Sequence, residues 1–258
     1  GSDVTWEVDN GTLKISGGTL DDQTHPWDHN DSITNVKITG TLHLDGDAPT
    51  YMFAQLPNVT NIDLTNIDTS NATKMYGMFS DDHSLTTVNL EKLNTSKVVD
   101  MNGMFYRTGF TSLTNIPLDT RNVTDMYWMF LGMTKLQHIS FGKDFLTNNV
   151  QNMGGMFSED SALHTLDLSQ FDLRTYAKFD YGTETGMFFD TPNLWKLTLG
   201  PDTTMIKEMT LPNVPGDGRA MPDNPNYKNT APYWVPVNDG TDYAPDNKGK
   251  QYSSDDLM

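Results

Sequence analysis

The chain has 258 residues, a formal net charge of −17 and no cysteine, and 36% of its residues are hydrophobic. The acidic balance argues against partners such as nucleic acid or an anionic membrane, and the lack of cysteine excludes disulfides, thiol catalysis and zinc–thiolate sites. The sequence contains no apolar run of about 18 residues that would predict a transmembrane helix, and no recognisable signal peptide. Because Gly1 and Ser2 resemble a cloning scar, we expect a signal peptide and an anchor to have been removed from a longer protein.

The first predicted unit, residues 3–50, is an N-terminal β-hairpin cap followed by a first coil. Residues 5–8 and 12–15 alternate apolar and polar side chains around an Asp-Asn-Gly turn signal, a pattern typical of a hairpin. A solenoid exposes its apolar core at each end, so a terminal unit has to cover it. We expect the hairpin to do this together with Trp6 and Trp27.

The central predicted unit, residues 51–199, is organised around a Met-Phe dipeptide that recurs after 26, 26, 25, 27 and 31 residues. The pairs are Met52-Phe53, Met78-Phe79, Met104-Phe105, Met129-Phe130, Met156-Phe157 and Met187-Phe188. A period in the twenties is typical of stacked repeats. L-x-x-L-x-L runs between the pairs predict short strands, and Met-x-x-Met-Phe boxes place apolar side chains on one side of a helical turn. The sequence therefore predicts an α/β repeat solenoid of about six coils, right-handed and leucine-rich-repeat-like, with short strands, short helical turns and the hairpin cap.

The composition changes after Leu199. Eight prolines fall between Pro201 and Pro245, and no further Met-Phe box follows. We predict a Pro-rich C-terminal cap over residues 200–258, with a flexible linker as the alternative. An insertion at residues 178–185, just before the last box, predicts a loop on one face of the solenoid.

Two closing boxes resemble a known family. Asn71-Ala-Thr-Lys-Met-Tyr-Gly-Met-Phe79 and Asn122-Val-Thr-Asp-Met-Tyr-Trp-Met-Phe130 are similar to the repeats of BspA-like leucine-rich-repeat surface proteins of Gram-positive bacteria, in particular the lactobacillal type. The resemblance covers about residues 5–199. It implies a secreted, cell-wall-attached protein that takes part in adhesion and host contact, and it names no ligand.

Outward-facing residues of the predicted strands form one candidate binding surface. Residues between the apolar positions of a strand point away from the core, so stacked coils align them in two rows. The candidates for ligand binding in these rows are Asn61, Asp63, Thr87, Asn89, His138, Ser140, Thr165 and Asp167. Their small polar side chains predict a flat recognition surface for a glycan or protein. A solvated β-face without a ligand is the alternative.

Aromatic residues inside the Met-x-x-Met boxes are a second group of candidates. Tyr76, Tyr127 and Trp128 occupy positions where other repeats carry small residues. Such rings could stack on sugars or anchor a protein partner. The alternative is lateral packing against the next coil.

Catalytic and metal-binding chemistry has weaker support. A glycosidase needs two carboxylates about 5–9.5 Å apart, whereas four coils separate Asp63 from Asp167, roughly 19 Å. In a Ser140–His138–Asp167 triad, the first two residues would stand about 7 Å apart on one strand, and no nucleophile elbow surrounds the serine. The His- and Asp-rich residues 25–31 match no metal-ligand spacing. We therefore predict no catalytic residue, no metal and no cofactor.

Together these patterns predict a non-catalytic binding module, an adhesin, at a bacterial cell surface. The expected partners are a host or extracellular-matrix protein, mucin or a glycan, bound by a monomer, with no nucleic acid and no direct membrane insertion. A structural stalk that presents another domain away from the cell wall is the first alternative. A hydrolase is the second.

Overall fold

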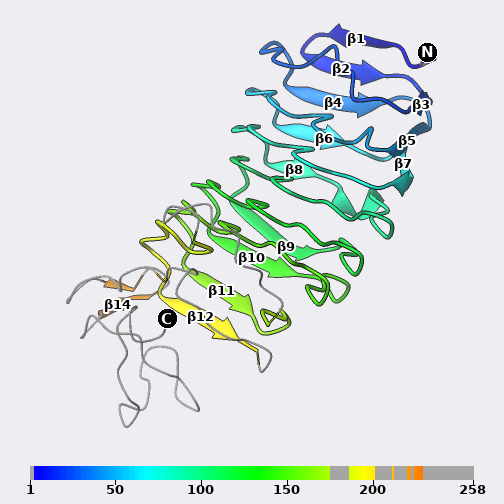
Figure 1. The fold of residues 1–258 in the computed structure, drawn as a ribbon. Helices are drawn as coiled ribbons and strands as arrows, with labels where there is room; N and C mark the ends of the chain where they lie inside the picture. The colour runs from blue at the N-terminus through cyan, green and yellow to red at the C-terminus, as the bar shows by residue number, and fades with distance from the viewer. Residues whose placement is uncertain (1–2, 175–185, 201–210, 212–219, 222–223, 229–258) are drawn as a thin grey trace.

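In the computed structural model, residues 3–174, 186–200, 211, 220–221 and 224–228 are described. They contain a β-solenoid in which the strands of successive coils lie side by side along the long axis (Figure 1). The loop expected at residues 178–185 lies outside the described residues. So does most of the expected C-terminal segment, where the structure describes one antiparallel strand pair.

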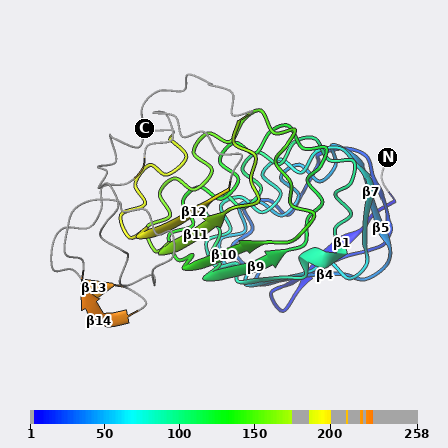
Figure 2. The same ribbon diagram turned by 90° about the horizontal axis from the view of Figure 1, so that it is seen from below.

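The strands are short and most pair in parallel. They are β1 (Trp6–Asp9), β2 (Thr12–Ile15), β3 (Gly18–Leu20), β4 (Asn35–Ile38), β5 (Leu42–Gly46), β6 (Asn61–Asp63), β7 (Ile67–Ala72), β8 (Thr87–Val88), β9 (Ser112–Ile116), β10 (His138–Phe141), β11 (Thr165–Leu168), β12 (Lys196–Leu199), β13 (Ala220–Met221) and β14 (Asn224–Lys228). One sheet has the order β1-β2-β4-β6-β8 and another the order β3-β5-β7, and β9 pairs with β10, β11 with β12 and β13 with β14. Figure 2 shows β9 to β12 along one side of the coils and the turn-rich segments on the opposite side.

An antiparallel hairpin begins the first sheet. β1 pairs with β2, and β2 then pairs in parallel with β4. The turn residues Asn10 and Gly11 both have positive φ (47° and 76°), as a two-residue type I′ turn requires. Behind the hairpin, Trp27 is buried, donates its indole N–H to the Met52 carbonyl at 2.7 Å and contacts Trp6 edge to face. The hairpin and the two tryptophans thus lie against the first coil, where the core would otherwise be open.

The Met-Phe pairs form the core. All six phenylalanines and their methionines are fully buried. The six phenylalanine rings stack on one another along the solenoid, with centroids 5.6–6.3 Å apart and interplanar angles of 3–20°. We call this row the phenylalanine ladder. It gives neighbouring coils one continuous apolar core.

The predicted helical turns are wrong. Among the described residues the sole helix is the three-residue 3-10 helix η1 (Leu90–Lys92), so the fold is a β-solenoid and not an α/β solenoid. Gly77, inside the Met75–Phe79 box, has φ +58°, and Asp81, two residues after it, has φ +60°; these left-handed values end any right-handed helix. The backbone N–H groups of Gly77, Phe79 and Asp81 donate instead to carbonyls of the next coil at 2.8–3.0 Å. Two successive tight turns therefore bury the methionines and phenylalanine on one side without a helix.

A row of buried threonines joins the coils at the Asp-Thr-Ser-Asn run. Each threonine hydroxyl donates to the backbone carbonyl of one residue in the next coil and accepts the N–H of that same residue; these threonines are Thr69, Thr95, Thr120 and Thr147. All four are at most 2% exposed. We call this row the threonine ladder. It satisfies backbone groups that would otherwise be buried without a partner.

Two fully buried aspartates have incomplete hydrogen bonding. Oδ1 of Asp82 accepts the Leu56 N–H and Oδ1 of Asp160 accepts the Met133 N–H, each at 2.8 Å. Their Oδ2 atoms have no partner in the described part of the chain. Burial raises the pKa of both carboxyl groups well above the usual value. The folded state therefore holds these protons more tightly than the unfolded state, and the free energy of unfolding falls as pH rises past the ordinary carboxyl pKa.

The double variant Asp82→Asn/Asp160→Asn is expected to be more stable than the natural chain at pH 7, by on the order of 2 kcal/mol or several degrees in Tm. Asparagine keeps the acceptor for each backbone N–H and cannot ionise, so the advantage should shrink as pH falls towards 4.5. Differential scanning calorimetry at three pH values measures this. The control Asp47→Asn also removes a negative charge, but Lys74 lowers the pKa of Asp47, so this variant should not gain stability at pH 7. The explanation would be contradicted if the double variant were no more stable than the natural chain at pH 7, or if its gain in stability did not change with pH.

Candidate functional site

The first of the two predicted polar rows, which contains Asn61, Thr87, His138 and Thr165, aligns in part. Asn35, Asn61 and Thr87 are register partners on β4, β6 and β8, and Ser112 and His138 are partners on β9 and β10. Thr165 is opposite Lys196 on β11 and β12. The described strands fall into separate sheets here, because β8 pairs with β6 and β9 pairs with β10. The row is therefore an interrupted, flat surface.

The residues of the second row, Asp63, Asn89, Ser140 and Asp167, make hydrogen bonds within the fold. Asp63 Oδ1 accepts the N–H and hydroxyl of Thr65, and Asn89 bonds to Asp63 and to the Leu64 N–H in the preceding coil. Asp167 Oδ1 likewise accepts the Ser169 N–H at 2.9 Å. These side chains form turns and coil-to-coil bonds, so a ligand would compete with the fold for them.

The residues of the rejected triad have other partners. The Ser140 hydroxyl accepts the Asn115 N–H at 2.8 Å, in the irregular stretch of β9 where Asn115 has φ +52°. β9 ends at Ile116, immediately before Pro117, whose missing N–H cannot join a ladder. His138 is exposed on β10.

The acidic and histidine-rich residues 25–31 do not converge. His25 is buried, bonds through Nε2 to the Ala48 carbonyl at 3.2 Å, and lies 5.7 Å from the Trp27 ring. Burial lowers the pKa of this imidazole. The described residues contain no group of three or more histidine, aspartate or glutamate side chains that could hold a metal ion.

The turn face presents aromatic rings where the fold favours glycine. The residue just before the Met-Phe pair has φ near +60° in five of the six boxes, and in three of these five it is a glycine, namely Gly77, Gly103 or Gly155. Tyr51 and Trp128 take the same position, each with φ +57°. A bulky residue in this conformation costs on the order of 1–3 kcal/mol, and such strain concentrates at functional sites.

Each of these rings lies over a glycine of the next coil. A Cβ on Gly77 would collide with the Tyr51 ring, and one on Gly155 would lie 2.6 Å from the Trp128 ring. The Trp128 indole N–H is buried there without a hydrogen-bond partner among the described residues. Trp128 therefore combines a left-handed backbone with a buried indole N–H that has no partner among the described residues, a feature that calls for an explanation.

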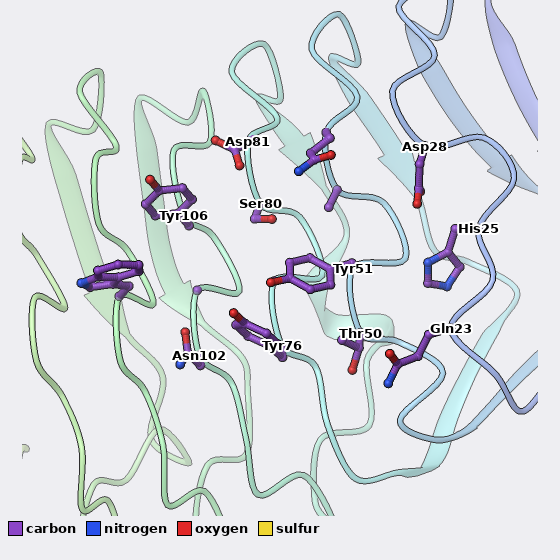
Figure 3. Close-up of a pocket in the computed structure, with 15 residues that line it drawn as sticks. Gln23, His25, Asp28, Thr50, Tyr51, Tyr76, Ser80, Asp81, Asn102 and Tyr106 are labelled. Carbon is purple, nitrogen blue, oxygen red and sulfur yellow. The ribbon is translucent and has the colours of Figure 1, made fainter.

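Together the rings line an open groove of about 360 Å³ across four coils. We call it the aromatic groove; its aromatic residues are Tyr51, Tyr76, Tyr106 and Trp128, and its main polar residues are Gln23, Asp28, Thr50, Gln55, Asp81 and Asn102. Figure 3 shows Tyr51 and Tyr76 across neighbouring coils, with Gln23, His25 and Asp28 at one end and Tyr106 towards the other. The groove thus combines flat ring surfaces with hydrogen-bonding groups.

The rings are held in contact with one another. Tyr51 and Tyr76 have centroids 4.8 Å apart, and Tyr106 stacks on Trp128 at 5.9 Å. Burial, together with a hydrogen bond that the Tyr51 hydroxyl donates to Tyr76, raises the pKa of Tyr51, and burial also raises that of Tyr106. Both hydroxyls therefore remain neutral hydrogen-bonding groups at physiological pH.

The groove includes some of the predicted aromatic residues and misses others. Tyr76 and Trp128 line it, while Tyr127 is 9% exposed and its ring lies beside Gly154 of the next coil, as the lateral packing alternative expects. Tyr51 and Tyr106 were not predicted. Aligning Tyr51 with the glycine of the later boxes would have revealed it, because it immediately precedes Met52-Phe53 just as Gly77 precedes Met78-Phe79.

These observations define the class of protein as a β-solenoid repeat protein with an aromatic groove on its turn face. A family model described as "Mycoplasma protein of unknown function, DUF285" matches residues 48–139 and 108–209. These matches span more than half of the chain, so the chain belongs to this family. The BspA-like leucine-rich-repeat character remains a resemblance. No curated protein and no solved structure matches the chain.

The described residues contain no helix long and apolar enough to cross a membrane.

Proposed function

We propose that this chain is a non-catalytic binding module whose ligand lies in the aromatic groove. The observation that carries the proposal is the pair of aromatic residues, Tyr51 and Trp128, held in the left-handed conformation that other coils give to glycine. Strain of this kind is a basis for inferring function when the surrounding structure offers a use for the side chain. Here the use is a row of flat ring surfaces beside polar side chains.

We place this binding function outside the cell, at a bacterial surface. The resemblance of the closing boxes to cell-wall-attached adhesion proteins, the absence of cysteine and the net charge of −17 support this location. The ligand would then be a host or extracellular glycan or protein. The structural stalk is the competing function, favoured by the continuous phenylalanine ladder, which would suit a rigid spacer.

The test is a binding screen of the purified chain against neutral and charged polysaccharides, mucin and matrix proteins. We expect saturable binding to at least one of them, lost in Tyr51→Gly/Trp128→Gly and retained in His138→Ala on the sheet face. Both substitutions restore the residue that neighbouring coils use, so the free energy of unfolding should change by no more than about 1 kcal/mol per site, as relief of strain offsets lost ring contacts. Binding lost in His138→Ala instead would place the site on the strands. No binding by the natural chain would favour the stalk.

A further inference from the structure

The aromatic groove has chemistry that restricts the ligand. Tyr51 and Trp128 each lie beside a glycine of the next coil, Tyr51 also contacts the Tyr76 ring and Trp128 the Tyr106 ring, and Tyr51 is 38% exposed. Three coil-to-coil steps separate these two residues, roughly 14 Å at about 4.8 Å per step. A ligand that contacts both must be elongated and must present apolar surface at intervals along its length.

Hydrogen-bonding groups of both kinds surround these rings. The side-chain amides of Gln23, Gln55 and Asn102 can donate and accept, and the carboxylates of Asp28 and Asp81 can only accept. Thr50 is 5% exposed, and its hydroxyl has no hydrogen-bond partner within the described residues. The groove therefore suits a ligand that is rich in groups able to donate and accept at once.

Charge rules against an anionic ligand. The carboxylates of Asp28 and Asp81 line the groove, and Asp100 lies close enough to act on the Tyr51 hydroxyl. The guanidinium carbon of Arg107 lies over the Tyr106 ring, 4.8 Å from the ring centroid. A basic peptide would satisfy the carboxylates, but its ammonium and guanidinium groups only donate, so acceptors for the amide N–H groups would have to come from its backbone alone, whereas every sugar hydroxyl both donates and accepts.

We propose that the aromatic groove binds a neutral polysaccharide chain that runs across the coils, parallel to the solenoid axis. This inference rests on the proposed function and names its ligand class. The apolar C–H faces of successive sugar rings stack on the tyrosine and tryptophan rings, and sugar hydroxyls bond to the amides and carboxylates between them. Because the aromatic rings follow one another from coil to coil, a polysaccharide that stacks on several of them must run along the solenoid axis.

The test uses isothermal titration with four neutral probes, namely mannan, glucan, galactan and N-acetylglucosamine oligomers, beside hyaluronan, polygalacturonate, oligolysine and mucin. We expect saturable binding of at least one neutral probe, with no dependence on ionic strength, since no net charge is neutralised. Affinity should rise with oligomer length until the groove is filled and then become constant. Tyr51→Gly and Trp128→Gly should each weaken binding by about tenfold, because each removes one stacking surface. His138→Ala should leave it unchanged.

The outcomes separate the two proposals. In one outcome, no neutral probe binds, but one of the other four probes (hyaluronan, polygalacturonate, oligolysine or mucin protein) binds and Tyr51→Gly abolishes that binding. The proposed function then stands, and the proposal of a neutral polysaccharide is wrong. If no probe binds, or if binding ignores both groove variants, both proposals are overturned. Thermal unfolding of each variant shows whether it is folded, and the two single variants, in separate coils, provide independent measurements.

Discussion

Replacing Phe105 with alanine is expected to lower the free energy of unfolding by about 3–5 kcal/mol. Phe105 is fully buried at the middle of the phenylalanine ladder. Its ring stacks on Phe79 and on Phe130, each at 5.6 Å, and meets Phe110 edge to face at 6.2 Å. Alanine loses these contacts and leaves a cavity that rigid neighbouring coils cannot close. In a protein of this size the loss corresponds to roughly 10 °C in Tm.

Urea unfolding followed by circular dichroism measures this change. Phe53→Ala provides the comparison, because Phe53 begins the ladder and stacks on Phe79 at 6.1 Å. It should cost less than Phe105→Ala. Val99→Ala, at an exposed position, should change stability by no more than about 0.5 kcal/mol. Equal losses for the three variants would show that the ladder does not act as a continuous core.

Replacing Thr120 with valine is expected to cost about 2–4 kcal/mol, although the two side chains have nearly the same shape. The Thr120 hydroxyl donates to the Leu146 carbonyl and accepts the Leu146 N–H, both at 2.6 Å. Valine leaves both backbone groups of Leu146 without these partners in a site where Thr120 is 1% exposed. Each buried unsatisfied group costs about 1–3 kcal/mol.

The matched control is Thr86→Val. The Thr86 hydroxyl also bonds to a carbonyl of a neighbouring coil, that of Thr60 at 3.3 Å, but at an exposed position where water can replace it. Its loss should be no more than about 0.5 kcal/mol. Thermal unfolding of both variants makes the comparison. A similar small loss for both would mean that the threonine ladder contributes little beyond its shape.

The period and the core could be predicted from the sequence because both depend on residue type and spacing alone. The recurring Met-Phe pair identified every ring of the phenylalanine ladder. The spacing could not distinguish a helical turn from the two successive tight turns observed, because side chains at i, i+3 and i+4 lie on one side in both. Gly77, Gly103 and Gly155, each just before a Met-Phe pair, were the signal for the turns.

The candidate site was predicted less well. Tyr76 and Trp128 belonged to a suspected aromatic patch, but the groove also needs Gln23 and Asp28, from the segment before the repeats. No repeat pattern places that segment beside the boxes. The second polar row was predicted as a surface, yet Asp63 and Asn89 bond within the fold, because side chains beside short strands also complete the adjoining turns.

The hydrogen bonds of the turn face run along the solenoid, from each coil to the next: Gly77 to Asn102, then Gly103 to Tyr127. A pull on the two ends of the coil stack therefore acts along these bonds, and every interface between coils carries the same force because the interfaces lie in series. The weakest interface opens first, since neighbours alone hold each coil. Under sufficient tension such a stack lengthens in steps, one interface at a time.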